Sequence, residues 1–258
     1  MSQRVPFEIS ALKVMKKYPP ELYYRGDLSL LDRPKVSIVG SRNISDYTRM
    51  MTFTLAKALA KRGVCIVSGA AMGVDAQAHR GAGAENTIAV MGNGLDIRYP
   101  ATNRDLIGEI EEKGLMLSQF NEGFRATGWS FVVRNELVVA LGDILIVAQA
   151  ECDSGSMRSV EYAQKMGKEI WVFPHRITES SGTNRLLLEG EAKPIYDIEQ
   201  FAGRFGAAVQ REIPKDTFFY FCQKMPTLDE ALSQFGERVY EAELEGVITV
   251  QNGKVILT

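Results

Sequence analysis

The chain has 258 residues, a mass of 28.6 kDa and a formal charge of −2 at neutral pH, with an apolar share of 45 % and a charged share of 24 %. These values suit a globular protein with a buried core and exclude the strongly basic surface of many nucleic-acid-binding proteins. No apolar run reaches the ~18–20 residues of a membrane span, and the first ten residues lack a secretory h-region. Three separate cysteines, Cys65, Cys152 and Cys222, argue against a disulfide framework or a zinc site, so we expect a cytoplasmic protein.

Residues 1–34 read as an irregular lead-in, because prolines and Gly26 interrupt them. Between residues 35 and 202, short β-branched runs alternate with amphipathic stretches, which is typical of a doubly wound, extended Rossmann-like α/β fold with a mostly parallel sheet. The predicted strands are Val36–Val39, Val64–Val67, Thr87–Val90, Leu115–Leu117, Ile144–Val147 and Glu169–Phe173. The predicted helices are Asp46–Arg62, Asn103–Lys113 and Met157–Met166, each followed by a glycine that can end it.

Residues 203–216 are a predicted linker, and residues 217–258 a small separate domain. Helices are expected at Thr217–Lys224, Thr227–Phe235 and Glu237–Glu245, followed by a hairpin that turns at Asn252-Gly253. Three helices and a hairpin indicate a winged-helix-like domain. The glutamates of its third helix would be repelled by phosphates, so we expect this domain to contribute little to DNA binding.

The loop after the first strand contains Gly40, Ser41 and Arg42. In doubly wound folds this position binds phosphates: glycine lets the backbone approach, and serine and arginine donate hydrogen bonds. Asn43 is a further candidate. The same residues could also form an ordinary tight turn with a surface arginine.

The second strand ends at Ser68-Gly69, on the same edge of the predicted sheet, and Gly73 begins the next helix. Asp75 and His79 lie one helical turn apart. They could form an acid–base pair, but we favour a structural role, with Asp75 at the helix N-terminus and His79 packed and hydrogen-bonded. With His175 as the only other histidine, we expect no catalytic site, metal or cofactor.

Arg134-Asn135 lies just upstream of an apolar stretch, with Phe131 and Trp129 nearby. A cation, an amide and aromatic rings suit a site for phosphates and bases, although Phe131 could equally be a core residue. Ser154, Gly155 and Ser156 precede another helix and could be either a simple N-cap or a phosphate loop. Four such loops on one edge of one sheet favour a shared phosphate-binding site.

The sequence resembles the DNA-processing protein A (DprA/Smf) family in a series of motifs that occur in family order: YPPELYYRGD, VSIVGSR, IVSGAAMGVDAQAH, TIAVMGNGLDIRYPATN, FVVRNELVVAL, SGSM, VFPHR and SGTNRLLLEG. The resemblance implies a homodimeric protein, not an enzyme, that binds incoming single-stranded DNA in natural transformation, protects it and loads the RecA recombinase. It also implies site roles: a phosphate clamp of Gly40, Ser41 and Arg42, a stacking Phe131, and pocket walls formed by Ser68, Gly69, Arg134, Asn135, Ser154, Gly155 and Ser156.

The chain departs from the family pattern at several positions of this motif. Glu136 stands where the family has an arginine, Val132 replaces a proline, and Gly128 occupies the place of a lysine that some relatives carry. Arg125 is the nearest basic substitute for that lysine.

The main alternative is a phosphoribohydrolase-like enzyme on the same fold, with Glu161 as the catalytic carboxylate near Ser154–Ser156. The Pro-Gly-Gly…Gly-Thr loop of such enzymes is absent. A pure protein-interaction adaptor is a third possibility, but it would leave the phosphate-type loops unexplained.

Overall fold

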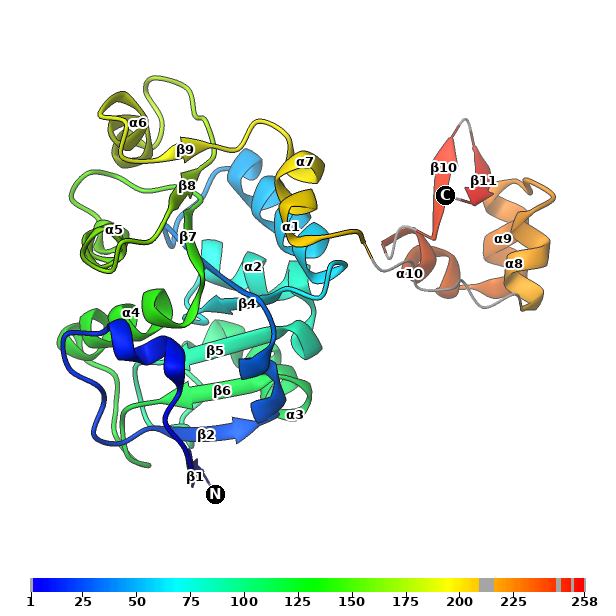
Figure 1. The fold of residues 1–258 in the computed structure, drawn as a ribbon. Helices are drawn as coiled ribbons and strands as arrows, with labels where there is room; N and C mark the ends of the chain where they lie inside the picture. The colour runs from blue at the N-terminus through cyan, green and yellow to red at the C-terminus, as the bar shows by residue number, and fades with distance from the viewer. Residues whose placement is uncertain (1, 209–215, 245–246, 252, 258) are drawn as a thin grey trace. The chain divides into compact units, whose positions relative to one another are not determined.

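The computed structural model describes residues 2–208, 216–244, 247–251 and 253–257, and the chain forms two compact units, Met1–Val209 and Gln210–Thr258. The larger unit is built on a nine-stranded sheet in the order β1-β2-β6-β5-β4-β3-β7-β8-β9 (Figure 1). Its strands are β1 (Gln3–Arg4), β2 (Tyr23–Gly26), β3 (Lys35–Val39), β4 (Cys65–Ser68), β5 (Thr87–Met91), β6 (Leu115–Ser118), β7 (Ile144–Val147), β8 (Ile170–Val172) and β9 (Lys193–Pro194).

All strands from β3 to β9 run parallel, which confirms the predicted mostly parallel α/β sheet. β3 lies at the centre: its Val36 pairs with Ile66 of β4 on one side and with Ile144 of β7 on the other. Every residue of β3, β4, β5 and β6 is buried. Their continuous apolar sequences are therefore those of strands covered on both faces.

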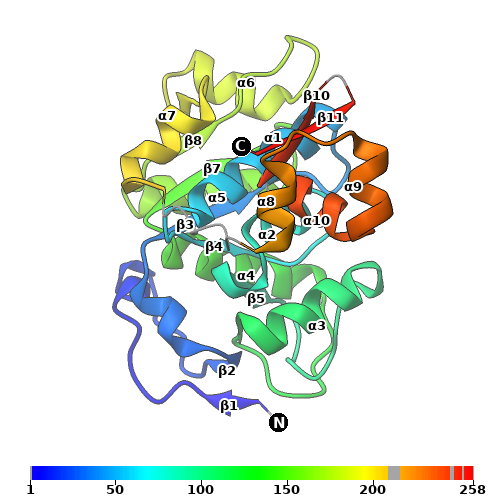
Figure 2. The ribbon, with the colours of Figure 1, turned by 90° about the vertical axis from the view of Figure 1, so that its right-hand side faces the viewer.

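Helices cover both faces of the sheet (Figure 2). One face carries α1 (Asp46–Ala60), α2 (Val74–Ala82), α3 (Arg104–Lys113) and α7 (Ile198–Ala202), whose buried residues form two neighbouring core clusters with the strands. The other face carries α4 (Gly128–Leu141), α5 (Gly155–Lys165) and α6 (Ser181–Leu188), which share one core cluster. The chain therefore winds from the central strand to both sides of the sheet.

The N-terminal segment is part of the larger unit, so the prediction of a separate irregular lead-in over residues 1–34 is wrong. β2 pairs antiparallel with β6, with Tyr24 opposite Leu117, and β1 pairs with β2. Leu12 and Leu30 are buried in the core cluster of the α4 face. The strand was not visible in the sequence because its pairing depends on the distant β6.

Two helix starts illustrate how local sequence determines the boundaries. α1 begins after Ser45, whose hydroxyl accepts a hydrogen bond from the Thr48 amide. It ends at Ala60, and the turn that follows reaches Gly63, which has a φ of +77°. α4 begins after Thr127, which forms a capping box with Ser130. The predicted position of Arg134 upstream of this helix is therefore wrong, because Arg134 lies inside it.

The smaller unit contains three helices followed by a hairpin, in the predicted order. They are α8 (Thr217–Cys222), α9 (Leu228–Phe235), α10 (Arg238–Leu244), β10 (Ile248–Gln251) and β11 (Lys254–Leu257). Gln251 pairs with Lys254, so the turn falls at residues 252–253, of which Asn252 lies outside the described residues. The unit has its own core, which includes Phe218, Cys222 and Val255. Its assignment as a winged-helix-like domain stays a prediction.

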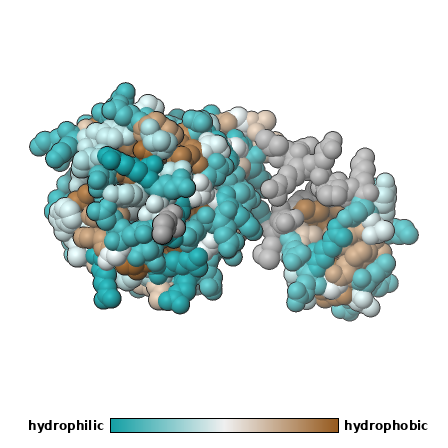
Figure 3. Space-filling model, turned by 90° about the horizontal axis from the view of Figure 1, so that it is seen from below, coloured by the Kyte–Doolittle hydropathy of each residue, from teal (hydrophilic) through white to brown (hydrophobic). Residues whose placement is uncertain are grey.

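The predicted linker, residues 203–216, is described only at its ends. Residues Gly203–Phe205 form a 3-10 turn, and Arg204 packs over the Trp171 ring at 4.6 Å, so this part belongs to the larger unit. On the face that Figure 3 shows, the surface of the larger unit is mostly hydrophilic, with apolar side chains in small patches. None of the helices in the described ranges has the length and apolar composition needed to cross a bilayer.

Candidate functional site

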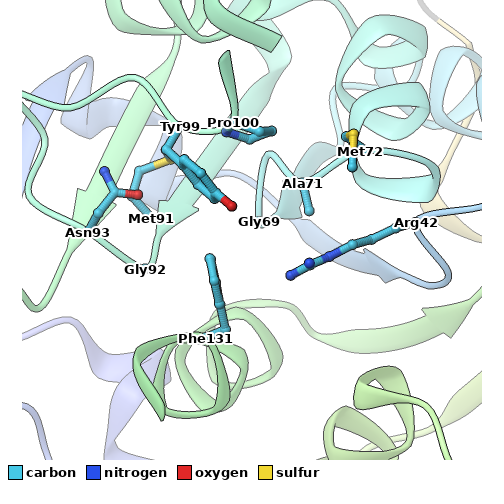
Figure 4. A pocket seen from close by; sticks show the side chains of 10 residues that line it. All are labelled: Arg42, Gly69, Ala71, Met72, Met91, Gly92, Asn93, Tyr99, Pro100 and Phe131. Carbon is cyan, nitrogen blue, oxygen red and sulfur yellow. The ribbon is translucent and has the colours of Figure 1, made fainter. Parts of the chain in front are cut away.

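A pocket opens at the carboxyl edge of the sheet, where the loops after β3, β4 and β5 meet the first turn of α4 (Figure 4). It is lined by Arg42, Gly69, Ala71, Met72, Met91, Gly92, Asn93, Tyr99, Pro100 and Phe131. Parallel strands end at the same edge, so the loops that follow β3 and β4 come together as predicted. The loop of Ser154, Gly155 and Ser156 does not line this pocket.

Phe131 is the centre of the pocket and is half-buried. The Arg42 guanidinium carbon lies 5.3 Å from the centroid of its ring, and the Tyr99 ring lies 6.0 Å away at an interplanar angle of 32°. Figure 4 shows the Arg42 side chain extending toward Phe131 across the opening. Arg42 is exposed and has no hydrogen-bond acceptor among the described residues, so it is open to an anionic ligand.

Arg134 has a different role from the one predicted. Its side chain is buried, and Nη1 donates hydrogen bonds to the carbonyl oxygens of Gly69, at 2.5 Å, and Val90, at 2.8 Å. Its Nε donates to Oδ1 of Asn135 at 3.1 Å. Arg134 therefore does not present its guanidinium to solvent, and it ties α4 to the ends of β4 and β5. Asn135 is half-buried beside it.

The electrostatics of the pocket come from two arginines and one buried carboxylate. Burial raises the pKa of the Asp75 carboxyl, although Arg134 nearby opposes this shift. Burial also lowers the pKa of Arg134; Asp75 opposes that change and the positive charge of Arg42 adds to it. Because Asp75 compensates only one of the two guanidinium groups, the exposed Arg42 leaves the pocket mouth positive. An anion bound there would reduce the repulsion between Arg42 and Arg134.

The amides of Gly69–Ala71 are already occupied, although glycine-rich loops of this kind often bind phosphate. Oδ2 of Asp75 accepts from the amides of Gly69 and Ala71 at 3.2 and 3.4 Å, and Nε2 of His79 accepts from the Ala70 amide at 3.2 Å. Asn103 donates to the carbonyls of Ala70 and Ala71. These contacts confirm the predicted structural roles of Asp75 and His79. Because its amides are satisfied internally, the loop shapes the pocket and is not a set of free donors.

Gly40 and Gly69 lack a side chain because neighbouring atoms pack directly against their backbone, more than because a ligand must come close to them. A Cβ atom on Gly40 would lie 2.5 Å from Cγ2 of Val74, and one on Gly69 would lie 1.8 Å from Nη1 of Arg134. Both contacts are far shorter than van der Waals distance. A side chain at Gly69 would displace the buried guanidinium of Arg134.

The serines of the first two loops differ in accessibility. Ser68, predicted as a pocket wall, is fully buried, and its hydroxyl donates to the Ile38 carbonyl at 2.6 Å, so its side chain lies in the core and not in the pocket lining. Ser41 is half-buried, and its backbone is held by Gln149 and Val74 at 2.8 and 3.1 Å. Asn43 is exposed next to Arg42. The groups of this loop that face solvent are thus the side chains of Ser41, Arg42 and Asn43.

The remaining predicted residues lie outside the pocket lining. Ser154 is the N-cap position of α5, but its buried hydroxyl has no hydrogen-bond partner within the described part of the chain. Gly155 is exposed and Ser156 is half-buried in the first turn. Arg125 is exposed shortly before α4. Within the described part of the chain, none of these four residues lines the pocket, so each would have to act beyond it.

The residues proposed for a hydrolase do not form an acid–base site. The Glu161 carboxylate is engaged by Arg158 on the same helix, at 3.0 Å. The buried His79 has a pKa lowered to about 3, because burial and the charge of Arg134 oppose protonation. No group of His, Cys, Asp and Glu side chains arranged to hold a metal occurs among the described residues.

Sequence reasoning missed most of the pocket lining and identified only Arg42, Gly69 and Phe131. Gly92 and Asn93 follow β5 by the same strand-end rule that identified the other loops, so that signal was available. A Cβ on Gly92 would lie 2.9 Å from Cδ1 of Phe131, which explains the glycine there. Tyr99 could not be placed from sequence, because the long loop that carries it has no periodicity.

Comparisons with known proteins find relatives that match most of the larger unit. A family model described as DNA recombination-mediator protein A matches residues 5–206. Among curated relatives, Protein Smf of Synechocystis is 35 % identical over 197 residues, covering 73 % of this chain and 49 % of that protein. DNA processing protein DprA of Streptococcus pneumoniae is 37 % identical over 176 residues, covering 67 % of this chain and 62 % of that protein. The chain thus spans about half to somewhat under two thirds of these relatives' lengths.

Two solved structures are similar over most of the larger unit. DNA processing protein A of Helicobacter pylori, whose structure was described for its unique single-stranded DNA binding mode, is 42 % identical with a TM-score of 0.77. The match covers 79 % of this chain and 95 % of that one. The Streptococcus pneumoniae DprA structure is 33 % identical with a TM-score of 0.73, covering 80 % of this chain and 74 % of that one.

Proposed function

Because this chain belongs to the DNA recombination-mediator protein A family, we propose that it binds single-stranded DNA at the pocket around Phe131. The observation that carries the proposal is the unpaired Arg42 guanidinium, held 5.3 Å from the ring of the half-buried Phe131. A base can stack against an aromatic ring while an arginine binds the adjacent phosphate, whatever the base. The family relationship to the Helicobacter pylori protein supports this assignment.

The biological role is proposed from the family. We infer that the protein acts in natural transformation, where it would protect incoming single-stranded DNA and load the RecA recombinase. A binding protein needs an accessible cation and stacking surface but no acid–base pair, and the pocket has the first two. The occupied Glu161 and the buried, neutral His79 speak against the phosphoribohydrolase alternative.

The sites proposed for DNA are reduced from the predicted set. Arg42 and Phe131 make the primary contacts, with Ser41 and Asn43 beside them and Asn135 at the pocket wall. Arg134 acts from below by positioning Gly69 and Phe131, whose ring centroid lies 5.7 Å from its guanidinium carbon. Gly40, Ser68 and Gly69 shape the loops. The bound DNA strand would contact the loop of Ser154, Gly155 and Ser156 only if it extends past β7.

The decisive experiment measures oligothymidine binding at several salt concentrations. Arg42→Ala should weaken binding and lower the slope of log K against log salt by about 0.7, the contribution of one phosphate contact on a single strand. Phe131→Ala should cost about 1–3 kcal/mol of binding free energy and leave that slope unchanged, because stacking releases no counterions.

Arg80→Ala provides the matched control. Arg80 is exposed and lies in the last turn of α2, at the opposite edge of the sheet, so its loss should leave affinity and slope unchanged. If Arg42→Ala binds as tightly as the unaltered protein at every salt concentration, the pocket is in the wrong place. Release of base from nucleoside monophosphates that Glu161→Ala abolishes would instead support the hydrolase.

A further inference from the structure

The pairing of surface arginines shows where the chain leaves positive charge available. Most exposed or half-exposed arginines of the larger unit are held by carboxylates, as seen for Arg25, Arg49, Arg62, Arg98, Arg158, Arg176, Arg185 and Arg204. Arg42, Arg104 and Arg125 have no carboxylate partner among the described residues, and all three are exposed in segments at the carboxyl edge of the sheet. A chain of net charge −2 thus keeps uncompensated positive charge beside the pocket.

Trp129 follows Arg125 by four residues and is unusually exposed for its size. Its side chain is 64 % exposed, although it sits in the first turn of α4, whose start is fixed by the Thr127–Ser130 capping box. Exposing so much of an indole ring forgoes the free energy of its burial. Such exposure of a large apolar side chain on a rigid helix is typical of a surface that binds a partner or ligand.

The Trp129 ring is supported from one side only. Phe120 contacts it edge to face, with centroids 5.9 Å apart and an interplanar angle of 71°. Phe120 is itself nearly buried and stacks on Phe124, at 4.4 Å and 10°. The indole therefore has a fixed base but keeps most of its surface free, which is the arrangement of a stacking platform.

Phe131 and Trp129 follow the edge of the sheet in order. Phe131 packs against Gly92 at the end of β5, whereas Trp129 packs against Phe120 just after β6. β5 and β6 are neighbours, and adjacent strands lie about 4.8 Å apart. The two supporting loops are joined by a hydrogen bond from the Gly94 amide to the Phe124 carbonyl, at 2.9 Å. The loops that support the two rings are thus tied to each other.

We propose that Trp129 is a second base-stacking platform, and that a single DNA strand runs from Arg42 over Phe131 to Trp129 and on to Arg125. This inference rests on the proposed function of the Phe131 pocket, since it extends the same strand. The unpaired Arg125 favours a nucleic acid over a purely apolar partner for this surface, because it supplies the phosphate contact that a stacked base needs next to it.

The chain allows a direct optical test, because it contains only two tryptophans, Trp129 and Trp171. Trp171 lies on β8 against Phe201 and Arg204, away from the proposed path. In the Trp171→Phe variant, saturating oligothymidine should quench the fluorescence of Trp129, since a stacked base quenches an indole. In the Trp129→Phe variant, the remaining fluorescence of Trp171 should not change.

Binding measured by anisotropy of labelled oligothymidine separates the two proposals. Trp129→Ala should weaken binding of long oligomers roughly 5- to 150-fold, whereas Trp129→Phe should retain most of the affinity. Val132→Ala, on an exposed residue one turn away, is the control for the helix surface. Normal binding with unquenched Trp129 would overturn this inference and leave the Phe131 pocket standing. Absence of any binding would remove the proposed function itself.

Discussion

Two arginines at one pocket illustrate how burial decides what a residue does. Arg42 and Arg134 both approach the Phe131 ring, at 5.3 and 5.7 Å. Arg42 is exposed and open to a ligand, whereas Arg134 is buried and its Nη1 donates hydrogen bonds to two backbone carbonyls. Replacing Arg134 would leave those carbonyls without a partner, so its loss would disturb the folded loop before it could affect a phosphate.

His79 makes the stability of the pocket loop dependent on pH. Its Nδ1 lies 2.5 Å from the Thr87 hydroxyl, and its Nε2 accepts from the Ala70 amide, which requires the neutral ring. Burial lowers its pKa to about 3, below the ordinary value of 6.5. The unfolded chain therefore binds this proton at higher pH than the folded one. The stabilisation is complete above pH ~6.5 and is lost as the pH falls toward 3, by up to about 1.4 kcal/mol per pH unit.

Urea unfolding at pH 7.5, 6 and 5 tests this expectation. The free energy of unfolding should fall more steeply with acidification in the unaltered protein than in His79→Gln, which has no titrating ring. Asp75 has the opposite effect on the free energy of unfolding, because burial raises the pKa of its carboxyl group and acidification therefore favours the folded state at this residue. Both proteins contain Asp75, so the difference between their curves does not include its contribution. Parallel curves for the two proteins would show that His79 does not carry the effect.

At the scale of elements, α4 organises the site. Its first turn presents Trp129 and Phe131, its middle buries Arg134, and its last carbonyls accept hydrogen bonds from Lys168. Burial lowers the pKa of that lysine to about 8, while its position at a helix C-terminus suits a positive charge. The helix is therefore held at both ends, which keeps its N-terminal aromatic residues in place.

The elements of the smaller unit give a prediction for DNA binding. α10 exposes Glu237, Glu241 and Glu243 at its start and along its length, an arrangement that phosphates would repel. Removing residues 209–258 should therefore leave the affinity for oligothymidine within a few-fold of that of the full chain. Gel-shift titrations of both proteins at the same salt concentration measure this. Loss of binding in the shortened protein would assign the DNA contact to the smaller unit instead.

At the scale of the whole molecule, we expect a homodimer formed by the larger unit. The three consecutive leucines of α6 are mostly internal: Leu186 is buried and Leu187 packs against the core, so of the three only Leu188, 87 % exposed, remains available. Ile177 and Tyr196, in the same part of the chain, are 96 % and 83 % exposed. These three exposed apolar side chains are our candidates for contacts in self-association.

Light scattering at micromolar concentration should give about twice the chain mass of 28.6 kDa. Leu188→Glu should shift the protein to the monomer mass, because it places a charge at an apolar position proposed to be buried in the dimer. Val14→Glu, at an exposed apolar residue in the N-terminal segment, should leave the dimer intact. An unaltered protein that is monomeric throughout would refute the expected dimer.

The sequence by itself determined the class of fold and the edge of the sheet where the site lies. Buried parallel strands need continuous apolar runs, and glycines and caps mark the helix ends, so β3 to β8 and most of the helices were recognisable locally. The loops after β3 and β4 followed from the rule that parallel strands end together. The family resemblance came from the order of motifs and needed no geometry.

Only the tertiary structure decided which side chains of those loops are free. Arg42 and Arg134 look alike in sequence, but α4 begins at Gly128, so Arg134 turns inward beneath Gly69. Strand β2 and the position of Tyr99 in the pocket lining were also not predicted, since each depends on contacts with segments far away in the chain. Exposure and hydrogen-bond partners are properties of packing between distant residues, and local patterns do not encode them.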